Sequence, residues 1–284
     1  MVNEQRKRIY ALLLIMVLIL LCSYYIYNRP TDVNKLSSVK NAIELSAEKI
    51  VYLEDIGIGN ITCTGLTYDS KDNTFWIGDY GALEKDQIPQ PKLYEVTADF
   101  LRVLRIIQLD NLEETANLQG VSYDSVNDSL WIATGKYIHE IDKKGTMIQS
   151  VKLGKYESYH SNGICYDDDD DSIWVLCYSM YLLHYDKNGN LVGTFRSNYL
   201  DQDHIMYEQG GLYLSVGADY QGPNNFIVQF IPSKRQRNIK YKLTDSYAIE
   251  GICQFGGKLI VLNDGKYHSS KIAKSYISIY DIKE

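Results

Sequence analysis

A repeated block constrains the fold of this chain more than any other feature of its sequence. The block reads TGLTYDSKDNTFWIGD from Thr64, QGVSYDSVNDSLWIAT from Gln119 and NGICYDDDDDSIWVLC from Asn162, and it returns in weaker form from Asp203 and Glu250. The second residues of successive blocks are separated by 55, 43, 41 and 47 positions. Repeats of this length, built from short strands of alternating hydrophobicity, are typical of β-propellers. The sequence therefore predicts an all-β propeller rather than a helical repeat protein.

Each repeat is expected to form one blade of four antiparallel strands. In the second repeat, GVSYD and SLWIAT flank a tight turn, and KYIHEID and MIQSVKL flank another at Lys143–Gly145. The last repeat ends after YISIYDI without a fourth strand, whereas Lys49–Glu54 has the pattern of a strand that belongs to no repeat. We expect this N-terminal strand to complete the last blade, which closes a five-bladed ring over residues 48–284. A six-bladed ring is the alternative, but the strands for it are not found.

The first 28 residues form a separate segment. Arg6, Lys7 and Arg8 precede an apolar run from Ala11 to Cys22, and several tyrosines follow it. This pattern predicts a cytoplasmic basic tail at 1–10 and a transmembrane signal anchor at 11–28. By the positive-inside rule, the protein is then a single-pass protein of the cell membrane with an extracytoplasmic propeller. A cleaved signal peptide is the alternative, although the leucines before Cys22 are not the small residues that cleavage requires.

Residues 29–47 are expected to be a linker with a short helix around 39–46. From residue 29 onward the chain carries 26 basic and 35 acidic residues, which gives a net charge of −9. An acidic domain of this kind is not expected to bind nucleic acid. Its cysteines, Cys63, Cys165, Cys177 and Cys253, lie in strand-like segments, so we expect free buried thiols; a disulfide remains the alternative for an exported domain.

The tryptophans of the first three repeats, Trp76, Trp131 and Trp174, share one position on the second strands. We interpret them as packing between neighbouring blades. Together with the Gly-hydrophobic-x-Tyr-Asp entry and the Asp/Asn turn, this pattern resembles the SdiA-regulated (YjiK-like) family of membrane-anchored bacterial propellers. The segment Ala248-Ile249-Glu250-Gly251-Ile252 is similar to a signature of that family, except that Ile249 stands where the family has an acidic residue. The motifs also resemble esterase-like phytases, lactonase-type propellers and NHL repeats. The resemblance implies an exported ring and supplies no substrate.

Propeller topology brings the start of every first strand to one face of the ring, at the mouth of the central channel. The residues directly before the repeat glycine position all carry oxygen: Thr64, Gln119, Asn162, Asp203 and Glu250. The ends of the second strands and the connections after them add Asp79, Tyr80, Tyr178, Asp219, Tyr220, Asn263 and Asp264, and His204 lies beside them. Because variable loops on a rigid scaffold often carry function, we expect the ligand-binding face here.

Oxygen ligands in this arrangement suit Ca²⁺ or Mg²⁺. The predicted metal ligands are Glu250 and Asn162, supported by Asp79, Asp203 and Asp264. The alternative is that these groups cap strand ends and bind channel water. The five aspartates of Asp167–Asp171 replace the turn between first and second strands, and without the spacing and glycine of an EF-hand they are interpreted as a solvated turn rather than a metal loop.

The resulting functional hypothesis is a membrane-tethered module that binds a protein, a glycan or a small molecule through its loop-rich face. The alternative is a divalent-metal-dependent hydrolase of lactone or phosphoester type, in which Glu250 and Asn162 hold the ion and a nearby His or Asp activates water. Neither a Gly-x-Ser-x-Gly elbow nor a Walker-type loop occurs in the sequence, so a serine hydrolase and a nucleotide hydrolase have no support.

Overall fold

The computed structural model of this protein describes residues 2–28, 41–59, 61–82, 88–110, 112, 117–178, 181–197, 199, 202–216, 225–264 and 274–282. Helix α1 (Val2–Asn28) comes first. Its segment Arg6–Tyr24 has a mean hydropathy of 1.9 and is long and apolar enough to cross a membrane, as an anchor or as a signal sequence.

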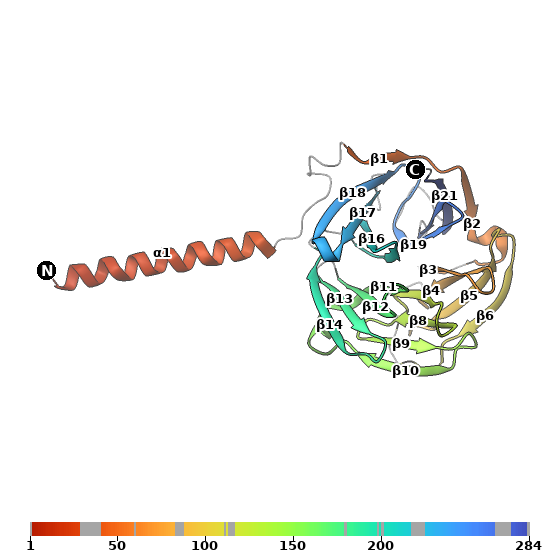
Figure 1. Cartoon of the computed structure of the whole chain (residues 1–284), viewed down its shortest axis with the longest axis horizontal. Helices are drawn as coiled ribbons and strands as arrows, with labels where there is room; N and C mark the ends of the chain where they lie inside the picture. Colours follow the sequence, from red (N-terminus) through yellow and green to blue (C-terminus); the bar gives the residue numbers. More distant parts are fainter. Residues whose placement is uncertain are drawn as a thin grey trace.

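The strands form five antiparallel sheets arranged as the blades of a ring (Figure 1). Blade one holds β3 (Cys63–Asp69), β4 (Thr74–Asp79), β5 (Lys92–Thr97) and β6 (Val103–Gln108), and blade two holds β7 (Gly120–Asp124), β8 (Ser129–Ala133), β9 (Tyr137–Ile141) and β10 (Met147–Lys152). Blade three holds β11 (Ser161–Asp167), β12 (Ser172–Cys177), β13 (Tyr181–Asp186) and β14 (Leu191–Arg196). Blade four holds β15 (Ile205–Glu208), β16 (Gly211–Val216), β17 (Asn225–Ile231) and β18 (Gln236–Leu243). The five-bladed prediction is confirmed.

Blade five joins the two ends of the propeller. It consists of β19 (Ile249–Phe255), β20 (Lys258–Asn263) and β21 (Tyr276–Asp281), completed by β2 (Lys49–Tyr52) from the N-terminal side. Val51 of β2 is buried and lies opposite Ile277 of β21. Figure 1 shows this pairing of the first and last parts of the ring. The predicted closure by an N-terminal strand is therefore confirmed.

The expected helix around 39–46 is wrong where the structure describes this segment. Ile43–Leu45 instead form strand β1, which runs parallel to β18 and gives blade four a fifth strand. The free edge of β18 offers unpaired backbone groups, and the Leu45 carbonyl accepts a hydrogen bond from the Thr244 N–H at 3.1 Å. Pairing with that edge prevails over the local preference for a helix.

A hydrogen-bonded turn explains the repeated Tyr-Asp and Trp positions. In the first three blades, the Trp indole N–H donates to the Asp that ends the first strand, at 3.4, 3.3 and 3.0 Å. The Tyr hydroxyl donates to Asn73, Asp128 or Asp171 at 2.8, 3.0 and 2.8 Å. These three acceptors have φ near +55° (55, 55 and 56), a conformation in which Asn and Asp are enriched. The tryptophans also pack against the next blade, as predicted.

The repeat glycines lie where neighbouring first strands come closest. A Cβ atom on Gly65 would be 2.6 Å from the Val121 nitrogen, and one on Gly251 would be 2.6 Å from the Leu66 Cβ. The first strands of the five blades contact one another around the ring, β3 with β7, β7 with β11, β11 with β15, β15 with β19 and β19 with β3. At Gly65 and Gly251 this approach leaves no room for a side chain, whereas the fourth repeat accommodates His204 at the same position. All four cysteines of the propeller are free and buried, as expected.

We expect Gly251→Ala to lower the free energy of unfolding by about 1–3 kcal/mol, because the added methyl group would collide with the backbone and side chain of Leu66. Gly59→Ala is the matched control, since a Cβ there meets nothing within 4 Å, and its effect should stay within about 0.5 kcal/mol. Urea unfolding followed by tryptophan fluorescence measures both. Equal stability of the two variants would contradict the close packing of the first strands.

Candidate functional site

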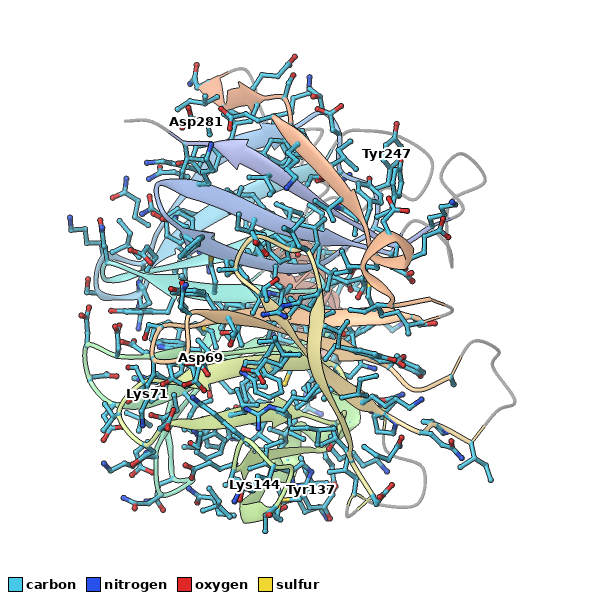
Figure 2. The ribbon with its side chains drawn as sticks, turned by 90° about the vertical axis from the view of Figure 1, so that its right-hand side faces the viewer. Asp69, Lys71, Tyr137, Lys144, Tyr247 and Asp281 are labelled. Carbon is cyan, nitrogen blue, oxygen red and sulfur yellow. The ribbon has the colours of Figure 1, made fainter. Side chains whose placement is uncertain are left out.

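The ring has two faces with different chemistry. The mouth face carries the starts of the first strands and the connections between second and third strands; the turn face carries the turns between first and second strands. Figure 2 shows Asp69 and Lys71 on the turn face and Tyr247, which precedes β19, on the opposite side. Each face presents a distinct group of acidic residues.

The polar residues predicted to ring the mouth lie in five successive blades, and several are hydrogen-bonded there. The Asn162 amide donates to the Asp203 carboxylate at 3.2 Å, which joins blades three and four. The Gln119 amide donates to the Asn117 side chain at 3.1 Å, and Thr64 is buried at the start of β3. Part of this ring therefore already bonds within the protein.

An acidic cluster of Glu250, Asp203 and Asp264 forms the most polar part of the mouth. Burial raises the pKa of Glu250 well above its usual value, and the neighbouring Asp203 and Asp264 carboxylates raise that pKa further. Asp264 is fully buried, and its carboxylate accepts a hydrogen bond from the Ser275 hydroxyl at 3.2 Å. The nearby Cys63 thiol has a raised pKa because it is buried and because Asp264 and Glu250 disfavour its thiolate. Glu250 consequently keeps its proton to a higher pH than an exposed glutamate does.

The supporting residues of the mouth have separate surroundings. Asp79 accepts a hydrogen bond from the Gly81 N–H at 3.0 Å, and burial raises the pKa of its carboxyl. Tyr80 accepts a hydrogen bond from the Asn117 amide, whereas Tyr178 is 63% exposed. Asn263 is buried and holds the backbone, since it accepts from the Tyr247 N–H at 3.1 Å. Asp219 and Tyr220 lie outside the described residues.

His204 occupies the glycine position of the fourth repeat. It is 1% exposed, and its Nδ1 accepts a hydrogen bond from the Ile252 N–H at 3.2 Å. Burial lowers the pKa of His204 to about 3, so the imidazole is neutral at physiological pH. His204 therefore links blades four and five, and so low a pKa makes it a weak general base.

The turn face holds a cavity that sequence reasoning missed. Its volume is about 410 Å³, within the range of small-ligand sites. Residues that follow the glycine position line it in layers: Leu66, Val121, Ile164 and Ile252 are apolar, and Tyr68, Tyr123, Tyr166 and Tyr207 come two positions later. The lining includes Asp168, Asp169 and Glu208 but no lysine or arginine. The signal in the sequence was the tyrosine shared by four repeats.

A second acidic group lies beside this cavity. In the described part of the chain, Asp167, Asp170 and His184 are the one set of three His, Cys, Asp or Glu side chains whose ligand atoms lie within 4.8 Å of one another. Burial, followed by the nearby Asp170, raises the pKa of Asp167 to about 6. Burial also lowers the pKa of His184, although Asp170 opposes this effect. The run Asp167–Asp171 is a turn, as predicted, but its first carboxylate is buried rather than solvated.

Comparison with known proteins supports the fold. No family model matches the sequence, and no curated protein is a detectable relative. The WD40 domain of Neurospora crassa Pan2 is similar in structure, with a TM-score of 0.50 and 10% identity over 84% of this chain and 69% of that chain. A chain of a nidogen/laminin complex gives 0.49, 12% identity and 72% coverage of both chains, and a protein of unknown function from Bacteroides caccae gives 0.48 with the same identity and coverage. The propeller class is thus shown, whereas membership of the SdiA-regulated family is not confirmed.

The acidic cluster predicts a pH-dependent difference between the wild type and Glu250→Gln. A glutamate whose pKa is raised by folding loses stability as the pH rises from its unfolded pKa toward its folded pKa. The amide does not ionise, so Glu250→Gln should be more stable than the wild type near pH 8, and the difference should shrink toward about pH 4. Thermal unfolding across this range tests the expectation. Exposed Glu44→Gln is the control, and the same pH profile in both variants would contradict the assignment.

Proposed function

We propose that this protein is a membrane-tethered binding module whose mouth face, on the extracytoplasmic side, recognises a partner protein. The carrying observation is the mouth itself, where a rigid ring presents a buried acidic cluster together with the exposed Tyr178 ring. Exposed aromatic side chains on a fixed scaffold are favourable contacts in protein interfaces. A glycan or small molecule is the other type of ligand that this face suits.

Helix α1 supplies the proposed tether. Its apolar segment follows Arg6, Lys7 and Arg8, the order expected for a signal anchor that keeps its N-terminus in the cytoplasm. Kinship with the SdiA-regulated family, which the Tyr-Asp and Trp positions suggest, belongs to this proposal. A fold shared at 10% identity does not by itself assign a partner.

A metal-dependent hydrolase is the second candidate, and one specific observation favours it. Burial raises the pKa of Glu250, and the charged groups that raise it further are the carboxylates of Asp203 and Asp264. A divalent cation would remove their mutual repulsion, and Asn162, bonded to Asp203, would add an oxygen ligand. Calcium or magnesium bound there would polarise a lactone or phosphoester oxygen, or activate water.

Site-specific photocrosslinking tests the binding module. A photoreactive phenylalanine derivative at Tyr178, on the mouth face, should give a partner adduct in intact membranes. The same derivative at Val126, which is 60% exposed on the turn face, should give none. Blotting for the shift in mass measures both. Adducts at Val126 alone, or at neither position, would count against the mouth face as the docking surface.

Metal-dependent melting tests the second candidate. Full-length protein in detergent should melt at a higher temperature in Ca²⁺ than in chelator, because an ion bound at 100 times its Kd contributes about 2.7 kcal/mol. Glu250→Gln should lose this increase, and the exposed Glu44→Gln should keep it. Turnover of lactone or phosphoester substrates should disappear with the same variant. An identical melting temperature with and without Ca²⁺ and Mg²⁺ would remove the hydrolase from consideration.

A further inference from the structure

The turn of blade three departs from the turns of blades one and two at several positions that meet in space. Asp167 ends β11 and is 4% exposed, Asp170 lies in the turn, and His184 comes from β13. Their ligand atoms lie within 4.8 Å of one another. These residue types, two carboxylates and one imidazole, are ligands of divalent transition ions.

The equivalent corner of blade one already holds a cation. Asp69 and Asp72 occupy the repeat positions of Asp167 and Asp170. The Lys143 ammonium, which comes from blade two, lies 2.6 Å from the Asp69 carboxylate and 2.9 Å from that of Asp72. This lysine is largely buried, and its pKa is raised because hydrogen bonds to Asp128, Asp69 and Asp72 outweigh the effect of burial. The acidic corner of blade one is therefore built around a positive charge, whereas in blade two the Asn127 amide donates to the buried Asp124 at 2.9 Å.

Blade four supplies no such lysine to blade three. Where blade two has the Lys143 turn, blade four has the short helix Pro232–Lys234. In the described chain, no lysine or arginine forms an ion pair with Asp167 or Asp170, although both residues are described. A buried carboxylate is unfavourable unless hydrogen bonds or an opposite charge compensate it, and a bound cation would supply the charge that Lys143 supplies in blade one.

His184 replaces a glutamate at the same corner. The residue paired with the repeat tryptophan is Glu95 in blade one and Glu140 in blade two, but His184 in blade three. The imidazole stacks on Trp174 with 4.0 Å between ring centroids and an interplanar angle of 4°. Its Nε2 lies 3.5 Å from the Asp170 carboxylate and 2.7 Å from the Ser172 hydroxyl. The ring is thus held with one nitrogen directed at the acidic group.

We propose that Asp167, Asp170 and His184 bind a divalent transition ion of the zinc type. Ligand bonds of about 2.0–2.1 Å would bring the three ligand atoms to about 3.4 Å apart, which requires a modest inward movement. Asp170 can make this movement, because its side chain is 54% exposed on a turn. The Trp174 indole N–H, 3.0 Å from Asp167, orients the buried ligand as a second layer of the site. The fourth position is left for water.

The ion would take the place that Lys143 has in blade one. It would also support the junction between blades three and four, because the Tyr207 hydroxyl of blade four donates to Asp169 of the same turn at 2.5 Å. Asp168 and Asp169 line the tyrosine-rich cavity, so the ion would stand beside that cavity. The site lies on the turn face and is independent of the proposed mouth site.

Zinc binding by the full-length protein in detergent, stripped of metal by a chelator, tests the proposal. Equilibrium dialysis with Zn²⁺ should give one tightly bound ion per chain, and Co²⁺ should show the visible absorption of a site with nitrogen and oxygen ligands. His184→Gln and Asp170→Asn should each weaken Zn²⁺ binding at least about tenfold. His160→Gln removes an exposed histidine on the mouth face and should leave the affinity unchanged.

Asp170→Asn keeps the test informative if His184→Gln does not fold, because Asp170 is half exposed. Melting curves without metal establish that each variant is folded. Zinc binding that survives both substitutions would overturn the proposal. So would loss of zinc in Glu250→Gln alone, since that result would place the ion at the mouth, and so would a wild type that binds no ion.

Discussion

The direct contact of backbone against backbone between the five first strands governs the rest of this structure. Five blades form a narrow ring, and Gly65 and Gly251 allow the strands to meet where a Cβ atom would collide with the next strand. This contact separates the two ends of the central channel. The mouth lies before the glycine positions, and the tyrosine-lined cavity lies after them.

Departures from the repeat carry more information about function than the repeat itself. The shared Tyr, Asp and Trp side chains form hydrogen bonds within each turn. A structural role therefore explains their presence in three blades. His204 stands where the other repeats have glycine, and His184 stands where blades one and two have glutamate. The turn that the shared positions build explains neither histidine. Positions that break a local rule are where functional constraints are expected.

The sequence was sufficient for the blades because their determinants are local. Turn residues, alternating strands and a strand missing at one end of the chain together specify five blades and their closure. Strand β1 was not foreseen, because three residues, Ile-Glu-Leu, carry too little pattern to indicate pairing with a strand about 200 positions away. His184 lies seventeen residues after Asp167 and belongs to a different strand. The sequence spacing therefore did not show that the strand pairing brings His184 back to the same corner.

The mouth illustrates a different limit. The residues directly before the glycine positions lie in successive blades, yet their individual roles depend on contacts that spacing does not encode. Asn263 proves to be committed to the backbone, Asp219 and Tyr220 lie outside the described residues, and the predicted ion ligands remain a proposal. What distinguishes Glu250 is its surroundings, because burial and two neighbouring carboxylates raise its pKa well above the usual value.

Blade one and blade three differ in how they compensate the buried aspartate that ends the first strand. Blade one neutralises its buried aspartate with Lys143, which shows that this fold has a simple way to stabilise such a charge. At the mouth the charges acting on Glu250 are carboxylates, and at blade three no lysine pairs with Asp167. Buried carboxylates destabilise the folded chain unless hydrogen bonds or opposite charges compensate them. A cation, or a cationic group of a partner, at each corner as proposed above would supply the compensation that Lys143 gives in blade one.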